Sequence, residues 1–277
     1  MAFFAGLCRD KWPGELGDAT HPSESVEHLA AWRTLPIAYE ALCERVITEG
    51  FGSNTHITMA HADLDADDGT TAFTVRLQGV VAEVNLKALG SWNGDVAQAP
   101  KATQHITLVG GGYDAAFSPQ RDGVLHLEEM IMSALGQPFV GELGRKGTIK
   151  LTRRVFKKVD AIETVVGVHL TSRDNPGAKA AKINHMWRVD HKIKTGIRTN
   201  GHHLTSVPPM AIRCGDFVDV AASVEVVLMR CKKGRKTEVQ LCPIEVVRLH
   251  TAPVVKFDAE GVTSDHEDDM ILTEEQE

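Results

Sequence analysis

The sequence predicts an α+β fold that is mainly β, and three observations lead to that prediction. Apolar residues repeat at helical spacing near the N-terminus, whereas after residue 147 apolar and polar residues mostly alternate with the period of a strand. No helices are interleaved with those later strands, which argues against a doubly wound α/β fold. Residues 257–277 are too acidic and too poor in apolar side chains to fold alone. We therefore expect N-terminal helices with a small antiparallel sheet, then a β-barrel or sandwich, and then a disordered acidic tail.

Length and composition indicate an intracellular globular protein. The 277 residues include 43% hydrophobic residues but no apolar run of membrane-spanning length. No basic residue precedes the short apolar start, so a signal peptide is not expected. The 5 cysteines are odd in number and form no CxxC pair, which favours free thiols over disulfides or a zinc site. We expect a protein of the cytoplasm or nucleus that is not secreted, has no membrane association and needs no cofactor or metal.

Helical periodicity occurs in three places. One short amphipathic helix should begin near Pro22 and end at Pro36. A second is expected over 39–50, with Gly50 at its C-terminal cap, and a third over 126–135.

The strand pattern is clearest near the C-terminus. Residues 217–229 and 237–249 should pair as a long hairpin, with Val220, Val224 and Leu228 buried. Other expected strands are 56–63 and 71–78, joined as a hairpin, followed by 80–86, 104–109, 148–158, 162–170 and 183–193.

Charge is segregated along the chain although the net charge is only −7. Residues 1–140 contain 8 basic and 18 acidic residues, whereas 141–256 contain 22 basic and 10 acidic residues. Residues 257–277 add 9 acidic residues with no lysine or arginine. This layout predicts an acidic α+β domain over 1–140, a basic β-barrel-like domain over 141–256 and a separate tail.

Recognisable catalytic and metal motifs are absent. The loop from Asp63 resembles a calcium loop, but its sixth position is Asp68 and its twelfth is Thr74. His185 and His191 share a predicted strand face but would lie roughly 20 Å apart, too far for one metal. His202 and His203 follow in a loop. We assign no catalytic residue, and an enzyme with a dispersed site near His185–His203 remains an alternative.

Three basic segments are candidates for binding phosphates, with cations that would converge on one groove if the strands form a barrel. Phe156 is expected to be exposed and to stack on bases, whereas Trp187 is expected to pack inside. The candidate residues are Lys150, Arg154, Phe156 and Lys158, then Arg188, Lys192, Lys194 and Arg198, and then Lys232, Lys233, Arg235 and Lys236.

A basic β-rich domain followed by an acidic tail resembles, in layout, single-stranded-DNA-binding proteins of the OB-fold type. We therefore expect a non-catalytic single-stranded nucleic-acid-binding protein whose acidic tail is autoinhibitory. One alternative is a protein-interaction or self-assembly module in which acidic and basic halves of different subunits dock, giving a homo-oligomer. The apolar residues Met270–Leu272 within the tail are also a candidate docking peptide for another protein.

Overall fold

The computed structural model describes residues 2–4, 12, 14, 16, 34–50, 56–61, 73–139, 141, 143–159, 167–198, 204–231 and 234–252. The helix predicted before Pro36, the calcium-like loop and the acidic tail lie outside these residues. None of the helices within them is long and apolar enough to cross a membrane.

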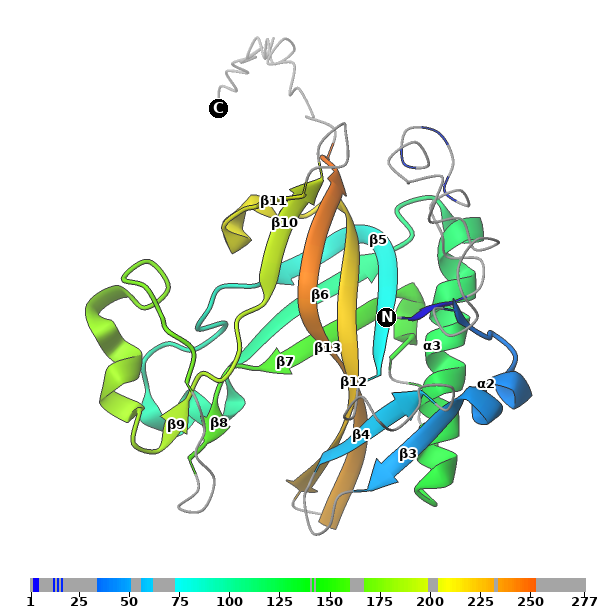
Figure 1. Ribbon diagram of the computed structural model, residues 1–277, viewed down its shortest axis with the longest axis horizontal. Helices are drawn as coiled ribbons and strands as arrows, with labels where there is room; N and C mark the ends of the chain where they lie inside the picture. The colour runs from blue at the N-terminus through cyan, green and yellow to red at the C-terminus, as the bar shows by residue number, and fades with distance from the viewer. Residues whose placement is uncertain are drawn as a thin grey trace, which may run out of the picture.

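The longest strands are β12 (Phe217–Cys231) and β13 (Gly234–His250), which form an antiparallel hairpin (Figure 1). Their register shifts beside Pro243, which cannot donate a ladder hydrogen bond. Val220 and Val224 are 0% and 1% exposed, so the hairpin predicted from strict alternation is confirmed. The side chain of Leu228 is not among those described.

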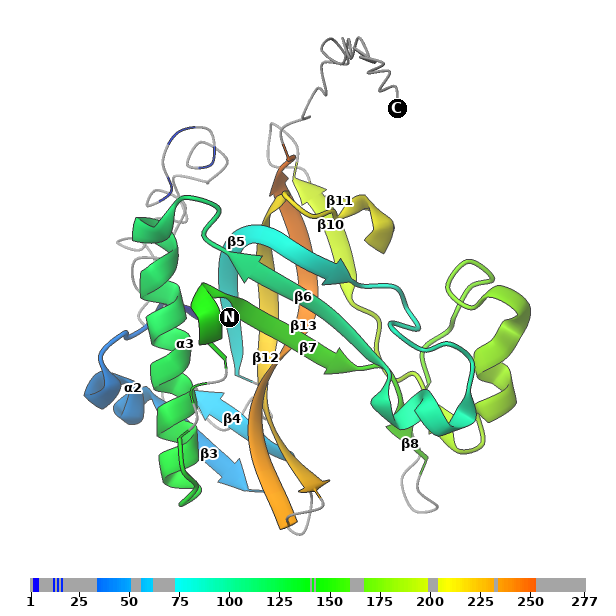
Figure 2. The same cartoon turned by 180° about the vertical axis from the view of Figure 1, so that it is seen from behind.

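A curved five-strand arrangement is built on this hairpin. β5 (Thr74–Asn85), β6 (Thr103–Val109) and β7 (Ile149–Arg154) form an antiparallel meander, and β5 also pairs with β12. The order is therefore β7-β6-β5-β12-β13 (Figures 1 and 2). In the described residues β7 lies beside β13 without a hydrogen-bonded ladder between them, so the predicted barrel is not closed.

Shorter strands extend the same sheet on both sides. β10 (Lys194–Arg198) runs parallel to β13 and carries β11 (Leu204–Ser206) on its other edge. On the opposite side β1 (Ala2–Phe4) joins β5 to β2 (Thr34–Leu35).

Two of the expected N-terminal strands pair differently from the prediction. β4 (His56–His61) pairs with β12 and with β3 (Val46–Gly50), so the hairpin expected between 56–63 and 71–78 is wrong. The strands expected at 71–78 and 80–86 are one strand, β5, whose register against β6 shifts between Val81 and Glu83. Strands from both sides of residue 140 thus share one sheet. The division into domains at residue 140 stays a prediction.

Two of the predicted helices are present with different limits. α2 (Tyr39–Arg45) ends earlier than expected because the β-branched Val46, Ile47 and Thr48 enter a strand instead. α3 (Asp114–Ala134) ends next to Gly136 as predicted but begins a dozen residues earlier. Pro119 and Gly123 lie inside its first half, where they obscure the helical pattern in the sequence.

A second, smaller core lies beside the main one and defines what we call the side lobe, residues 89–102, 155–159 and 167–193 (Figure 1). It contains the 3-10 helices η6 (Val96–Lys101) and η8 (Pro176–Ile183) and the two-residue strands β8 (Lys157–Lys158) and β9 (Trp187–Arg188). Val155 and Phe156 both turn into this core, so the strand predicted over 148–158 is broken after Arg154. The strand predicted over 183–193 is likewise wrong except at β9, because 3-10 helix η8 extends to Ile183.

One buried ion pair joins β5 to β12 within the main sheet. Arg76 donates to the Asp219 carboxylate at 2.9 Å and 2.7 Å, and Gln78 donates to it at 3.2 Å. Asp219 is 3% exposed, and the Arg76 guanidinium also lies 4.9 Å from the ring of Phe3. Because each of these partners satisfies the buried carboxylate, the charge is tolerated at the centre of the sheet.

Candidate nucleic-acid interface

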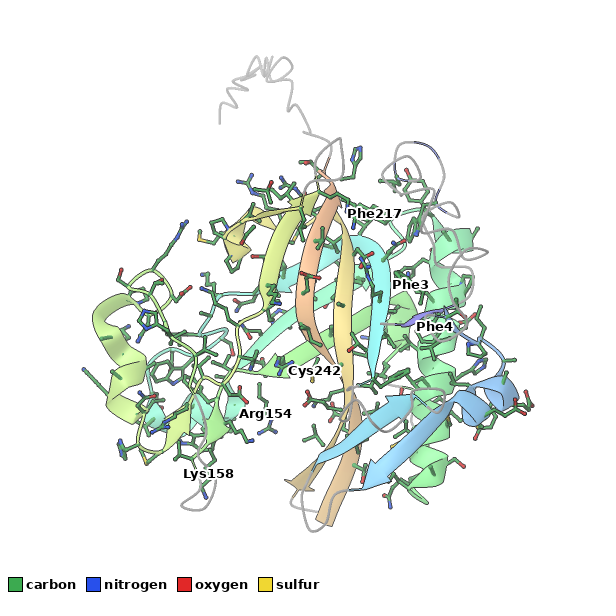
Figure 3. The ribbon with its side chains drawn as sticks, viewed as in Figure 1. Phe3, Phe4, Arg154, Lys158, Phe217 and Cys242 are labelled. Carbon is green, nitrogen blue, oxygen red and sulfur yellow. The ribbon has the colours of Figure 1, made fainter. Side chains whose placement is uncertain are left out.

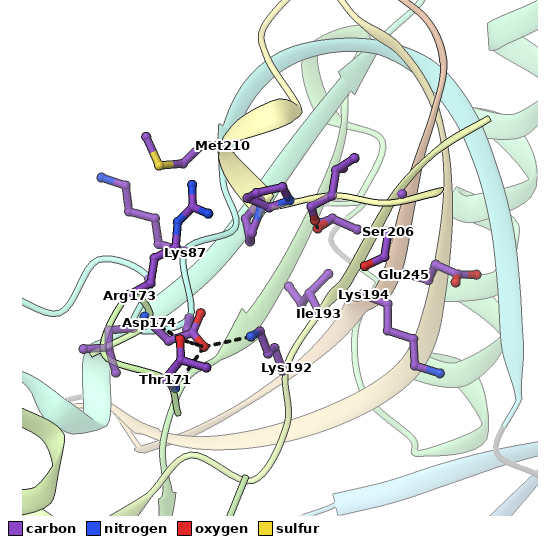
Figure 4. Close-up of a pocket in the computed structure, with 18 of the residues that line it drawn as sticks. Lys87, Thr171, Arg173, Asp174, Lys192, Ile193, Lys194, Ser206, Met210 and Glu245 are labelled. Atoms are coloured by element: carbon purple, nitrogen blue, oxygen red, sulfur yellow. Dashed lines mark hydrogen bonds and ion pairs between the residues drawn. The ribbon is translucent and has the colours of Figure 1, made fainter. Parts of the chain in front are cut away.

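A cavity of about 1110 Å3 lies between the side lobe and the β10–β11 side of the sheet (Figure 4). Residues from four segments line it, at 87–92, 171–179, 192–196 and 204–210. Glu245 of β13 completes the lining. The cavity therefore depends on the packing of the lobe against the sheet and not on any one loop.

The connection from β5 to β6 forms one wall, and its backbone is fixed by close packing. Gly90 has a φ of 52°, and a Cβ there would lie 2.2 Å from the carbonyl oxygen of Thr103. Ser91 donates its N–H to the same oxygen at 3.0 Å, and its hydroxyl accepts from the Thr103 N–H at 3.1 Å. Only glycine fits at position 90, so the wall begins at a defined turn.

Trp92 lies on this wall and is the aromatic side chain best placed to contact a ligand. Its indole N–H donates to the carbonyl of Asp95 at 2.7 Å, which fixes the ring. Its ring meets Phe156 edge-on, with centroids 5.0 Å apart. Trp92 lines the cavity and is only half-buried, so part of its surface is available for stacking.

Five cationic side chains line the cavity, which makes it strongly positive. They are Lys87, Arg173, Lys179, Lys192 and Lys194, and all are exposed. Among the described residues no carboxylate forms an ion pair with any of these except Lys192. The cavity can therefore attract anions to four cations that form no ion pair with a carboxylate of the described residues.

The exception is an ion pair at the base of the side lobe. The Lys192 amine donates to Oδ2 of Asp174 at 2.8 Å, and the Thr171 hydroxyl and N–H donate to the same oxygen at 2.9 Å and 3.2 Å (Figure 4). Partial burial by itself would raise the pKa of Asp174, but the hydrogen bonds from Lys192 and Thr171 outweigh it and hold the pKa below its ordinary value. Asp174 is therefore ionised at neutral pH.

A second polar cluster joins the lobe to the sheet behind the cavity. The Gln104 amide donates to the carbonyls of Leu86 and Lys87 at 3.3 Å and 2.9 Å, so its oxygen faces His191. The two ring nitrogens of His191 lie 3.1 Å from that oxygen and 2.7 Å from Oδ1 of Asp190. The His191 ring thus links Asp190 of the side lobe to Gln104 of β6.

The structure brings only two of the sequence-predicted residues into this cavity, Lys192 and Lys194. Lys150 and Arg154 lie on one face of β7, opposite Thr107 and Thr103 of β6. Arg154 also donates to the carbonyl of Pro100 at 3.1 Å, so it helps to fix η6. Figure 3 shows Arg154 and Lys158 close to β8, and these two do not line the cavity.

Of the remaining predicted cations, Arg188 and Arg198 do not line the cavity either. Lys158 pairs across β8–β9 with Trp187, and Arg188 pairs there with Lys157. Arg198 ends β10, opposite Leu204. Lys232 and Lys233 lie outside the described residues, and only the backbone of Arg235 and Lys236 is described, in β13. Whether these residues contact nucleic acid stays a prediction.

The expectation that Phe156 is an exposed stacking residue is wrong. Phe156 is 4% exposed and packs in the side lobe against Trp92. The alternation that assigned it to the basic face assumed a continuous strand, which ends at Arg154. Trp92, which lies in the loop between the first two strands of the meander, is the aromatic residue that sequence reasoning missed.

Of the histidines expected near a dispersed catalytic site, the structure describes His185 and His191. His185 is exposed, and the ring of His191 is engaged by Asp190 and Gln104. His202 and His203 lie outside the description. In the part of the chain that the structure describes, no three His, Cys, Asp or Glu side chains are grouped to hold a metal.

Comparisons with known proteins returned solved structures only. No family model and no curated protein matches the chain. The structure is similar to the gp2.5 single-stranded DNA-binding protein encoded by bacteriophage T7, with a TM-score of 0.40 and 14% identity over 68% of this chain and 97% of that one. It is also similar to the single-stranded DNA-binding protein of bacteriophage Enc34, with a TM-score of 0.34 and 10% identity over 80% of this chain and 98% of that one.

The Enc34 protein in complex with single-stranded DNA gives a TM-score of 0.34 as well, with 11% identity over 76% of this chain and 98% of that one. Scores this low do not define the ligand of this chain. The proposal below rests on its own residues.

Replacing His191 should weaken the packing of the side lobe against the sheet and so destabilise the fold. We expect His191→Leu to lower the free energy of unfolding by about 1–3 kcal/mol, because Gln104 and Asp190 would each lose a partner. His185→Leu is the matched control and should change it by less than about 0.5 kcal/mol, since His185 is exposed. Urea unfolding measures both, and equal effects would show that the His191 hydrogen bonds contribute nothing specific.

Proposed function

We propose that this protein binds single-stranded nucleic acid without chemically altering it, and that the cavity beside β10 is the centre of the binding surface. The observation that carries the proposal is the combination, in one cavity, of a fixed, half-buried Trp92 with four cations that form no ion pair with any described carboxylate. Cations pair with the phosphates of a single strand, and an aromatic ring stacks on its bases.

Electrostatic attraction between the cavity cations and phosphates would supply most of the binding affinity. Lys87 comes from the β5–β6 connection and Arg173 from the side lobe. Lys194 lies on β10, so the cations come from three separate elements. A flexible strand of phosphates can follow such a distribution, and each neutralised phosphate releases a bound counter-ion.

Apolar surface around the cavity supports binding of unpaired bases. Met210 and Leu204 line it and are 66% and 53% exposed, which is unusual for large apolar side chains. Together with Trp92 they offer surface to base faces. Bases of a duplex are already stacked on each other, so this surface favours a single strand.

The strand order also supports the proposal. A meander of β5, β6 and β7 followed by a hairpin of β12 and β13, with β12 paired to β5, is the order of strands in an OB-fold. In that fold the connections between strands 1 and 2 and between strands 4 and 5 contact oligonucleotides. Here the first connection carries Lys87 and Trp92, and the second is the Lys232–Lys233 turn predicted from sequence.

Reversing three cavity charges should weaken binding and its salt dependence together. We expect Lys87→Glu/Arg173→Glu/Lys194→Glu to reduce the slope of log K against log salt for oligo-dT by about 2, since each single-strand phosphate contact contributes about 0.7. Fluorescence anisotropy at several salt concentrations measures the slope.

The matched control is Arg121→Glu/Lys146→Glu/Lys150→Glu, which makes the same change in charge at α3 and the far end of β7. It should retain most of the wild-type slope. Equal losses in both variants would show that binding is non-specific attraction to a basic protein. Self-association of the wild-type protein without oligonucleotide binding would favour the assembly module instead.

We further propose that the acidic tail competes with nucleic acid for this cavity. Residues 257–277 hold 9 acidic residues and follow β13, the strand that pairs with β10. A short flexible tether gives an effective concentration on the order of millimolar, so even weak ion pairing would be populated.

Deleting 257–277 should therefore raise the affinity for oligo-dT at low salt. The gain should shrink as salt rises, because added ions screen the tail and the nucleic acid alike. Titration of full-length and truncated protein at two salt concentrations tests this. Equal affinities at low salt would contradict competition by the tail.

A further inference from the structure

We propose that Asp174 limits the affinity of the cavity by occupying Lys192 in the place of a phosphate. This inference rests on the proposed function and assigns one residue that sets how tightly the same site binds. Asp174 is an anion held among cations, at the point where an incoming phosphate would be attracted.

The contacts of Asp174 make it a substitute for a bound anion. Its Oδ2 accepts from the Lys192 amine at 2.8 Å and from the hydroxyl and N–H of Thr171 at 2.9 Å and 3.2 Å. A positive amine, a hydroxyl and a backbone N–H are also the donors that bind phosphate oxygens in proteins. The Asp174 carboxylate thus fills donors that a ligand would use.

The turn that carries Asp174 keeps the carboxylate in place. The N–H of Asp174 donates back to the Thr171 hydroxyl at 3.3 Å, so residues 171–174 form a hydrogen-bonded turn. The side chain of Asp174 is 11% exposed, whereas that of Lys192 is 40% exposed. Lys192 is therefore the more accessible partner, so a phosphate could reach its amine and replace the carboxylate.

Lys192 and Lys194 line the same cavity and are two residues apart, but they differ in how freely they can bind a phosphate. Figure 4 shows the Lys192 amine directed at Asp174, whereas the end of Lys194 points away from it. A phosphate gains the full attraction of Lys194 but must exchange with Asp174 to gain that of Lys192. The exchange lowers the affinity for every phosphate-bearing ligand.

Glu245 provides an internal comparison. It also lines the cavity and carries the same charge, but within the described residues it forms no ion pair with Lys192 or any other cation. It lies opposite Lys194 in the β10–β13 ladder, so removing its charge tests the electrostatic effect of a cavity carboxylate that forms no ion pair. Removing the charge of Asp174 tests that effect together with the release of Lys192.

The experiment is a double-mutant cycle on the full-length protein. Asp174→Asn and Glu245→Gln are each made alone and together with Lys192→Gln, and dissociation constants are measured for fluorescein-labelled oligo-dT at low salt. Asparagine keeps an oxygen that accepts from Thr171, so the turn should persist, and a thermal melt checks this.

We expect Asp174→Asn to tighten binding about fivefold, the equivalent of the upper value of about 1 kcal/mol for an exposed ion pair. In the Lys192→Gln background the gain should fall to less than about twofold, because only the general electrostatic effect of the carboxylate remains. Glu245→Gln should tighten binding less than about twofold, by the same factor in both backgrounds.

Two results would overturn this inference while leaving the proposed function intact. In one, Asp174→Asn and Glu245→Gln tighten binding equally. In the other, the full gain in affinity from Asp174→Asn is also measured in the Lys192→Gln background. Failure of the wild-type protein to bind oligo-dT would instead overturn the proposed function, and the inference with it.

Discussion

The structure depends on strand β12, which pairs with three other strands and is buried on both faces over its first half. Val218, Val220 and Val224 face the main core, while Asp219 on the other face is held by Arg76 of β5. A strand buried on both sides can neither slip in register nor twist away without exposing one of its faces. Since β5 and β4 precede residue 140 and β13 follows it, this strand joins the two differently charged parts of the chain into one sheet.

The cavity is assembled on the two neighbours of β12. β13 positions β10 and thus Lys194 through a parallel ladder, and β5 leads directly into the wall that carries Lys87 and Trp92. Gln104 and His191 then fix the side lobe against that wall. Cations from separate elements are brought together in this way. In the proposals above, Asp174 and the acidic tail would lower the affinity of this cavity for polyanions.

The sequence predicted the elements whose patterns are local and unambiguous. Strict alternation over 217–229 identified β12 because a helix would scatter those valines around its axis. Phe156 was misassigned because its neighbour Val155 also turns inward, which alternation does not foresee. Arg173 and Lys87 were overlooked because neither lies in a run of cations, and only the packing of the side lobe brings them together. Among the predicted cations, Lys192 and Lys194 line the cavity because Lys194 begins β10 and Lys192 lies just before it.

The central claim is that a single strand binds across the cavity with bases against Trp92. The most direct test is photocrosslinking of the wild-type protein to oligo-dT that contains 5-iododeoxyuridine, followed by mass spectrometry of the crosslinked peptides. The account predicts that the main crosslink lies at Trp92 and that an excess of unlabelled single strand, but not of duplex, suppresses it. Crosslinks confined to the face of β7 around Lys150 and Arg154, with none at the cavity, would contradict it.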